Sequence, residues 1–164
     1  MKKYIYPGTF CPPTIGHLRI LQRACSNFPS VTVVCSINPN KPKPSSYSDR
    51  IKLWKTYSNL PLNCNFVSLQ DFIYDYEKIN PKWDLTIIRG LRNIDELQFE
   101  QEVMLNAIKR HNVQEFHYIL SELKYRDVSS SKVRELIKLS QFDEAIKLTN
   151  PDIVKHLIVH QIGE

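Results

Sequence analysis

An α/β fold built on a five-stranded parallel sheet is predicted by two patterns in this sequence. Short runs rich in β-branched and aromatic residues alternate with longer segments whose apolar residues recur at helical spacing. The predicted strands are residues 4–6, 31–37, 65–69, 85–88 and 116–120. Because neighbouring parallel strands need crossover connections, this alternation indicates a Rossmann-like, doubly wound sheet with helices on both faces.

The segments between the strands are predicted to be helices. Residues 16–27 carry apolar side chains at helical spacing, and Ser48 is expected to cap a second helix. Residues 71–78 are expected to form a short third crossover, and a longer helix is expected after Arg92. Beyond the last strand Ser129 opens a further helix, and two more helical segments follow as a C-terminal helical extension.

Length and hydropathy indicate one domain that spans residues 1–164. A chain of 164 residues with 42% hydrophobic residues is long enough to bury one continuous core. The sequence has no apolar run long enough to span a bilayer, and Pro7 interrupts the start of the chain before a signal sequence could form. We therefore expect a cytoplasmic location and no membrane contact.

The net charge and the cysteine spacing limit the kinds of molecule and metal ion that the protein is expected to bind. The net charge of +5 suits an anionic partner, either a nucleic acid or a small phosphorylated molecule. The four cysteines form neither a CxxC pair nor a zinc-ligand pattern, so we expect reduced thiols and no metal-binding residues.

Three of the four glycines lie in polar segments that follow predicted strands or open a helix. These segments are 6–10 (YPGTF), 14–17 (TIGH) and 89–92 (RGLR). Glycine tolerates positive φ and lets backbone amides approach a ligand closely. In an open α/β sheet ligands bind beyond the carboxyl ends of the strands. The glycines therefore indicate a nucleotide site at that edge.

Basic side chains in the same regions could bind phosphate. His17 lies at the start of its helix, where unpaired amides and the helix dipole favour an anion. Lys41 follows the second strand, and Arg89 and Arg92 follow the fourth. Each has a plainer explanation, since a lone histidine is often structural, Lys41 could be a solvated loop charge, and Arg89 and Arg92 could be ordinary surface arginines.

The absence of three common catalytic and nucleotide-binding motifs from the sequence excludes several classes of reaction. The sequence lacks GxxxxGK[ST], GxGxxG and GxSxG, which argues against P-loop hydrolysis, dinucleotide oxidoreduction and serine-hydrolase chemistry. Nucleotide transfer remains. A phosphate monoester with a second pKa of about 6 is already largely dianionic at neutral pH and needs no general base. Catalysis would then depend on positioning and charge stabilisation.

The motifs carry a family resemblance. Thr14-Ile15-Gly16-His17 matches the (H/T)xGH signature of the nucleotidylyltransferase superfamily. With the YPGTF segment, Arg89-Gly90-Leu91-Arg92 and the run Ser129-Ser130-Ser131, the whole chain resembles bacterial phosphopantetheine adenylyltransferases. This resemblance implies transfer of AMP from Mg-ATP to 4'-phosphopantetheine, giving dephospho-coenzyme A and pyrophosphate. It also implies a homohexamer, Mg²⁺ as a cofactor, and inhibition by coenzyme A.

The resemblance assigns roles by position. It implies catalytic roles for His17, Lys41 and Arg92. It implies ATP contacts from Thr9, Phe10, His17, Gly90, Leu91, Arg92, Glu100, Tyr125, Arg126, Asp127, Val128, Ser129, Ser130 and Ser131. It implies phosphopantetheine contacts from Thr9, Lys41, Ile73 and Arg89. From the residues alone, Glu100 is also explained as a solvated helix carboxylate, Ile73 as a core residue and the serines as a helix cap.

One residue departs from the family pattern. Phosphopantetheine adenylyltransferases usually have Asp where this chain has Cys11. A thiol beside cationic groups and a helix start could have a lowered pKa, so we expect Cys11 to be alkylated faster than the other cysteines and to be protected by ATP.

Three other functions remain open at this point. A nicotinamide mononucleotide adenylyltransferase or a cytidylyltransferase would share the His17 segment. A nucleic-acid-binding module would explain the basic charge, although the lysines are dispersed along the chain. An inactive relative could bind nucleotide or coenzyme A without turnover.

Overall fold

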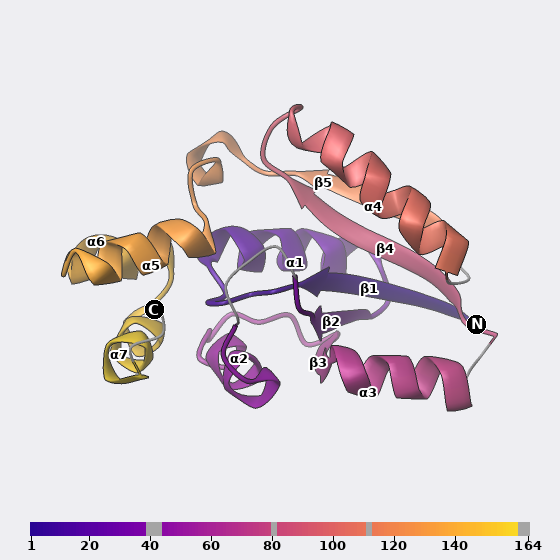
Figure 1. Ribbon diagram of the computed structural model, residues 1–164, viewed down its shortest axis with the longest axis horizontal. Helices are drawn as coiled ribbons and strands as arrows, with labels where there is room; N and C mark the ends of the chain where they lie inside the picture. Colours follow the sequence, from indigo (N-terminus) through magenta and orange to yellow (C-terminus); the bar gives the residue numbers. More distant parts are fainter. Residues whose placement is uncertain (39–43, 80–81, 111–112, 161–164) are drawn as a thin grey trace.

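Five strands form one parallel sheet. The strands are β1 Lys2–Gly8, β2 Val31–Cys35, β3 Cys64–Ser68, β4 Asp84–Leu91 and β5 Val113–Leu120. In the computed structural model, which describes residues 1–38, 44–79, 82–110 and 113–160, they lie in the order β3-β2-β1-β4-β5 (Figure 1). Every pairing is parallel, which confirms the predicted fold class. The second strand ends at Cys35, two residues before its predicted end.

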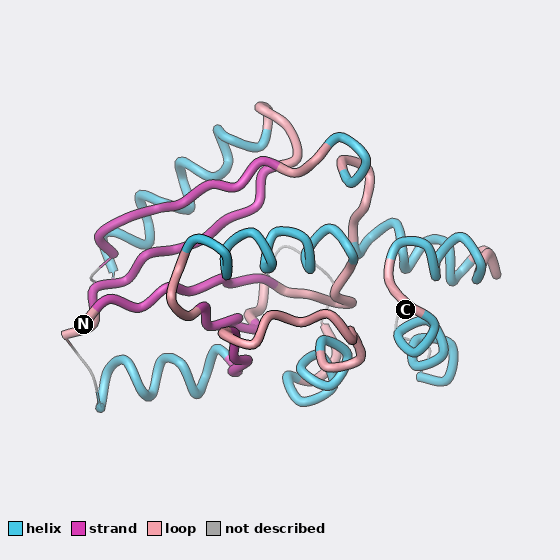
Figure 2. Tube along the Cα trace, turned by 180° about the vertical axis from the view of Figure 1, so that it is seen from behind, coloured by secondary structure: helices cyan, strands magenta, loops and turns pink. Residues whose placement is uncertain are grey.

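Helices connect the strands on both faces of the sheet. They are α1 Ile15–Asn27, α2 Tyr47–Trp54, α3 Leu69–Tyr74 with a π-helical continuation Asp75–Ile79, and α4 Glu96–Arg110. Side chains alternate along each strand, so neighbouring strand residues face opposite layers. Tyr6 and Ile88 pack with α1 and α2, whereas Ile5 and Ile87 belong to the core beneath α3. Figure 1 shows α3 and α4 in front of the sheet, and α1 is in front in the reverse view of Figure 2.

Three helices follow the sheet, as the sequence predicts. They are α5 Ser130–Lys138, α6 Phe142–Leu148 and α7 Pro151–His160, and a 3₁₀ turn, Leu123–Tyr125, precedes them. Val133 of α5 and Leu157 of α7 are buried in the core shared with α1 and α2. The extension is therefore joined to the face of the sheet that carries the start of α1.

Hydroxyl side chains set the start of four helices. Thr14, Ser46, Ser68 and Ser129 each accept a hydrogen bond from the backbone N–H three residues later, which satisfies one of the unpaired amides of the first turn. The expectation that Ser48 caps the second helix is wrong, because Ser46 does so and Ser48 lies inside α2.

Two of the three described glycines, Gly8 and Gly90, are needed for space. None of Gly8, Gly16 and Gly90 has a positive φ, so that part of the sequence interpretation is wrong. A Cβ on Gly8 would lie 2.5 Å from the Phe10 ring, and one on Gly90 would lie 3.1 Å from Ile20. The left-handed residue in this region is Phe10 itself, with φ of 48°.

The four cysteines are free thiols, as expected. Only 6% of Cys11 is exposed, whereas Cys25 and Cys64 are half-buried. This burial works against the expected preference of alkylating reagents for Cys11. No helix in the described part of the chain is both long enough and apolar enough to cross a membrane.

Candidate active site

Thr14 and His17 form a reciprocal cap at the start of α1. The backbone N–H of His17 donates to Thr14 Oγ1 at 3.3 Å, and the backbone N–H of Thr14 donates to His17 Nδ1 at 3.1 Å. Because Nδ1 accepts this hydrogen bond, the neutral imidazole has its proton on Nε2. The helix start therefore offers a ring N–H donor together with the positive end of the helix dipole, a combination suited to phosphate oxygen.

Phe10 supports the His17 ring. The two ring centroids are 5.1 Å apart with the planes at 84°, and Phe10 makes similar edge contacts with Tyr6 and Trp54 at 5.2 Å. The Phe10 side chain is buried. Its predicted contact with ATP is therefore limited to backbone atoms, and its ring holds the histidine in place.

Arg89 and Glu100 form a buried ion pair. Arg89 Nε donates to Glu100 Oε2 at 2.8 Å and Nη2 donates to Oε1 at 2.6 Å, while Nη1 reaches the Pro7 carbonyl at 3.2 Å. Burial disfavours the charged guanidinium, but the hydrogen bonds and charge of Glu100 raise the pKa of Arg89. Glu100 was expected to reach the nucleotide. Its carboxylate is instead held by Arg89, and the residue is 5% exposed.

The charges of Arg89 and Glu100 affect the pKa values of two nearby tyrosines, Tyr6 and Tyr118. Burial raises the pKa of Tyr118, the Glu100 charge raises it further, and Arg89 acts in the opposite direction. Burial also raises the pKa of Tyr6, although Arg89 opposes that shift. Both tyrosines therefore stay neutral at physiological pH and provide no general base here.

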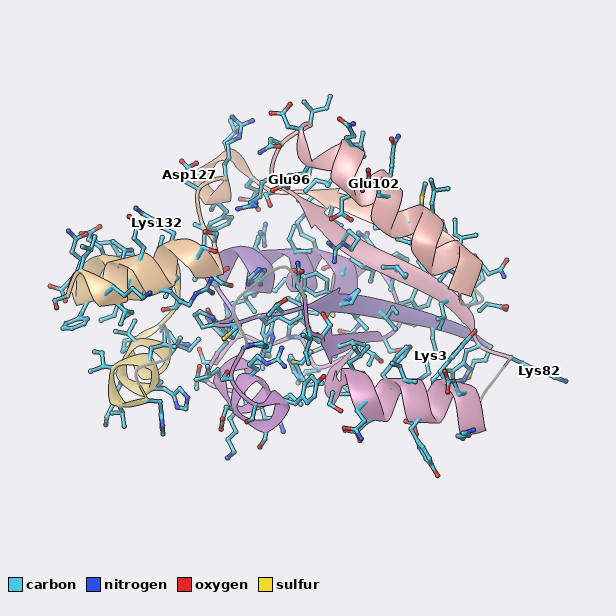
Figure 3. The ribbon with its side chains drawn as sticks, viewed as in Figure 1. Lys3, Lys82, Glu96, Glu102, Asp127 and Lys132 are labelled. Carbon is cyan, nitrogen blue, oxygen red and sulfur yellow. The ribbon has the colours of Figure 1, made fainter. Side chains whose placement is uncertain are left out.

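A pocket of about 450 Å³ opens between the end of β4 and the start of α5. Its lining residues are Arg92, Asn93, Arg126, Asp127, Ser129, Ser131, Lys132 and Glu135. Figure 3 shows Lys132 on α5, Asp127 in the connection before it, and Glu96 at the start of α4. Lys3 and Lys82 lie at the opposite end of the sheet (Figure 3). The pocket thus unites the Arg92 segment with the serine segment, as the sequence predicts.

Arg92 is oriented by a neighbour that the sequence analysis missed. Its Nε lies 2.8 Å from Glu96 Oε1, and its backbone N–H donates to Glu96 Oε2 at 2.8 Å. The Arg92 side chain is 44% exposed, so the guanidinium remains accessible from the pocket. The four-residue spacing of Arg92 and Glu96 was the available signal in the sequence.

The serine run both starts a helix and fastens a loop. Ser129 Oγ accepts the backbone N–H of Lys132 at 3.1 Å and so caps α5. Ser130 Oγ donates to the Pro12 carbonyl at 2.7 Å. Ser131 lines the pocket. The cap explanation and the anion-cradle explanation are therefore compatible.

Further contacts join the serine segment to the His17 segment. Val128 is buried and packs against Gly16. A Cβ added to Gly16 would lie 3.6 Å from the Val128 side chain. Arg134 donates to the Cys11 carbonyl and to Ser131 Oγ. These contacts hold the start of α5 beside the start of α1, so the pocket lies next to the helix that carries His17.

The remaining predicted site residues are placed as follows. Gly90 and Leu91 end β4, and Thr9 is half-buried after β1. Ile73 lies half-buried in α3 and is not among the described residues that line the pocket. Lys41 lies outside the described residues.

Several site residues were not predicted from the sequence. Lys132 and Glu135 lie one helical turn apart on α5 and follow the serines directly, which was a usable signal. Arg50 of α2 and Arg134 of α5 bind loop carbonyls of the site from elements distant in the sequence. Such contacts leave no local pattern, so single-sequence reasoning had no means to find them.

Known proteins match this chain over most of its length. The Cytidylyltransferase-like family matches residues 5–136. The phosphopantetheine adenylyltransferase of Pasteurella multocida is 35% identical, with 94% of each chain covered. That of Dictyoglomus thermophilum is 32% identical, with 99% of this chain and 96% of the relative covered.

Solved structures confirm the fold. Nicotinic acid mononucleotide adenylyltransferase of Plasmodium falciparum, complexed with NaAD, superposes with a TM-score of 0.68 at 15% identity and covers 98% of this chain and 96% of that one. A putative nicotinate-nucleotide adenylyltransferase of Vibrio parahaemolyticus gives a TM-score of 0.61 at 20% identity, covering 96% and 98%. At such identities the likeness concerns the fold alone.

Proposed function

This chain belongs to the Cytidylyltransferase-like family, and we infer that it is a phosphopantetheine adenylyltransferase. It transfers AMP from ATP to 4'-phosphopantetheine in coenzyme A biosynthesis. Relatives with this name match nearly the full length of the chain at 30% identity or more. The structural observation that supports this activity best is the junction of a helix-start histidine with a cationic pocket at the carboxyl edge of the sheet.

The reaction needs no protein nucleophile. A phosphate oxygen of 4'-phosphopantetheine attacks the α-phosphorus of ATP, and a new P–O bond forms. The bond between the α-phosphorus and the bridging oxygen of the β-phosphate breaks, and pyrophosphate leaves with that electron pair. Because the attacking phosphate is largely dianionic at neutral pH, no proton has to be removed from it. The products are dephospho-coenzyme A and pyrophosphate.

The chain contributes position and charge. His17 Nε2–H and the amides that begin α1 are directed by their cap to bind phosphate oxygens near the reacting centre. Arg92, Arg126 and Lys132 supply positive charge in the pocket for the nucleotide. Arg89 supplies a buried positive charge for the phosphopantetheine side, and Lys41 is proposed to bridge the two substrates.

Mg²⁺ is proposed to enter bound to ATP. The described residues contain no group of three or more His, Cys, Asp or Glu side chains placed to hold a metal ion. Mg²⁺ commonly keeps several waters and binds through substrate phosphates with one or two carboxylates. Asp127 and Glu135 are the carboxylates that line the pocket. When bound, the ion neutralises phosphate charge.

The other family properties are proposed with the function. A homohexamer is supported by apolar side chains that remain exposed on the single chain, including Leu105 and Ile108 of α4 and Leu123. We also propose a single domain over residues 1–164, a cytoplasmic location where ATP is available, and inhibition by coenzyme A at the substrate site.

Pyrophosphate release tests the function. We expect turnover with ATP and 4'-phosphopantetheine but none when nicotinamide mononucleotide, or glycerol 3-phosphate with CTP, is supplied. His17→Ala should lower kcat about 10²- to 10³-fold, as loss of one transition-state donor does elsewhere. His117→Gln is the matched control, because His117 packs on Phe28 and is absent from the pocket lining. Turnover with one of the other substrates would move the chain elsewhere in its superfamily.

A further inference from the structure

Arg50 is a buried cation bound to backbone carbonyls. It is 1% exposed, and its Nη1 donates to the Thr9 carbonyl at 2.6 Å and to the Ser36 carbonyl at 2.7 Å. Its Nε lies 3.4 Å from the Ser46 carbonyl. No ion pair between Arg50 and a carboxylate of the described residues is formed. Buried arginines are usually paired, so a guanidinium used in this way indicates a specific structural task.

The two strongest contacts of Arg50 join the loops after β1 and β2. Thr9 directly follows β1, and Ser36 directly follows β2. Both loops leave the carboxyl edge of the sheet, where ligands bind in this fold. The backbone N–H of Ser36 donates to the Gly8 carbonyl at 2.8 Å, so the two strand ends are already aligned. Arg50 extends that alignment into the loops from α2 below them.

The position that Arg50 fixes is coupled to His17. The Thr9 carbonyl belongs to the peptide unit that continues into Phe10, whose φ is 48°. This left-handed conformation is unfavourable for an aromatic residue and needs external support. It places the Phe10 ring against His17 at 5.1 Å. A chain of direct contacts therefore runs from the guanidinium through the Thr9–Phe10 backbone to the imidazole.

Nearby groups agree with this placement. The Arg50 guanidinium lies over the Tyr47 ring, with 4.8 Å from Cζ to the ring centroid. Burial raises the pKa of the Cys35 thiol to about 11, and the Arg50 charge partly opposes that shift. Cys35 therefore stays a neutral thiol beside the cation.

We propose that Arg50 is a positioning residue for adenylyl transfer, which holds the Thr9–Phe10 backbone so that His17 and the amides of α1 meet the reacting phosphates. This role rests on the proposed function. Arg50 acts through the loop and does not touch the substrates. Its planar guanidinium reaches two carbonyls from one nitrogen, a geometry that a lysine ammonium on its flexible stem reproduces poorly.

Steady-state kinetics of Arg50→Met and Arg50→Lys test the proposal. We expect kcat to fall about 100-fold in Arg50→Met, the size of effect that a misplacement of about 1 Å produces, while KM for ATP changes less than about threefold. Arg50→Lys keeps the charge and should recover about tenfold of that loss. The matched control is Arg23→Met, since Arg23 Nη1 also donates to a carbonyl, that of Leu120, at 2.5 Å. Its kcat should equal that of the wild type.

A second measurement reports the backbone conformation of Phe10 in the loop after β1. The nuclear Overhauser effect between HN and Hα of Phe10 is strong only when φ is positive, because that conformation brings the two protons closest together, and we expect this effect to be weaker in Arg50→Lys than in the wild type. Wild-type kcat in a folded Arg50 variant, or an effect on KM alone, would overturn the proposal. If the wild type gave no turnover, the proposed function would fail. The positioning role would then be decided by the HN–Hα nuclear Overhauser effect of Phe10, and an unchanged effect in Arg50→Lys would reject it.

Discussion

The guanidinium of Arg89 and the carboxylate of Glu100 meet in two hydrogen bonds, 2.8 and 2.6 Å long, between β4 and α4. The Glu100 side chain is 6% exposed and that of Arg89 is 24% exposed. A pair this buried stabilises little relative to apolar residues, but each partner is costly to lose alone. The pair therefore fixes where the Arg89 charge sits at the edge of the active site.

Glu100→Leu is expected to destabilise the protein by about 3 kcal/mol, because it leaves the Arg89 charge buried without its counterion. Denaturant unfolding measures this change. The double variant Arg89→Met/Glu100→Leu should lose less than the single variant, since it buries no unpaired charge. Additive losses in the double variant would show that the two side chains act independently, contrary to this expectation.

The same pair shows what a single sequence can predict about this site. Arg89 was found from a glycine-containing segment that the sequence placed after a strand, and in the structure it lies inside β4, two residues before the carboxyl end of that strand. The partner of Arg89 could not be predicted, because Glu100 lies a helical turn into α4 and looks like any solvated helix carboxylate. The parallel direction of the strands followed from the alternation of strand and helix periods, which is a local signal, whereas the strand order β3-β2-β1-β4-β5 was not predicted. The contacts of Arg50, Arg89 and Arg134 depend on tertiary packing, and tertiary packing leaves no local signal in the sequence.

Thr14→Val should weaken both the fold and the catalysis. Thr14 is fully buried, and its hydroxyl caps α1 beside the backbone N–H that fixes His17 Nδ1. Loss of the cap is expected to cost about 1–2 kcal/mol of unfolding free energy. It should also lower kcat, because His17 loses part of its orientation.

Ser68→Ala is the matched control for the lost cap. Ser68 caps α3 through the backbone N–H of Asp71, on the other face of the sheet. We expect a similar loss of stability from this variant and unchanged kcat, measured by denaturant unfolding and pyrophosphate release. Equal kcat in Thr14→Val and Ser68→Ala would disprove the orienting role of Thr14.

Gly8→Ala and Gly16→Ala should have opposite effects on stability. A Cβ at residue 8 would lie 2.5 Å from a ring that is packed on three sides by Tyr6, His17 and Trp54. Overpacking of this kind costs about 1–3 kcal/mol. A Cβ at residue 16 would meet its nearest neighbours at 3.6 Å, which is ordinary contact.

Gly16→Ala is therefore expected to stabilise α1 by up to about 1 kcal/mol, because alanine loses less conformational freedom in a helix. The same methyl group lies at the helix start that we propose to bind phosphate, so kcat/KM for ATP should fall. Thermal unfolding and steady-state kinetics separate the two effects. A Gly16→Ala protein with wild-type kcat/KM would contradict the close approach of substrate to this turn.

His156 is expected to make stability depend on pH at the junction of α7 and α2. Its ring is tilted by 39° against that of His160, with the ring centroids 4.3 Å apart, and its Nε2 is buried with no hydrogen-bond partner among the described residues. Burial lowers the pKa of His156 below 6.5, and the charges of His160 and of Lys52 on α2 lower it further, while Asp49 on α2 acts in the opposite direction. The unfolded chain therefore binds this proton more readily than the folded protein does. The contribution of neutral His156 to the free energy of unfolding is therefore fully present above the unfolded pKa of 6.5. It is lost as the pH falls through the lower pKa of the folded protein.

Thermal unfolding between about pH 5 and pH 8 tests this dependence. In the wild type the melting temperature should fall toward the acidic end of this range. His156→Gln removes the imidazole whose pKa is lowered, so the melting temperature of this variant should change less with pH. His160→Gln removes only one cause of the lowered pKa and should reduce the pH dependence by a smaller amount. The other titrating groups are common to all three proteins, so the comparison isolates His156. The same slope in His156→Gln and in the wild type would show that the acid sensitivity arises elsewhere in the chain.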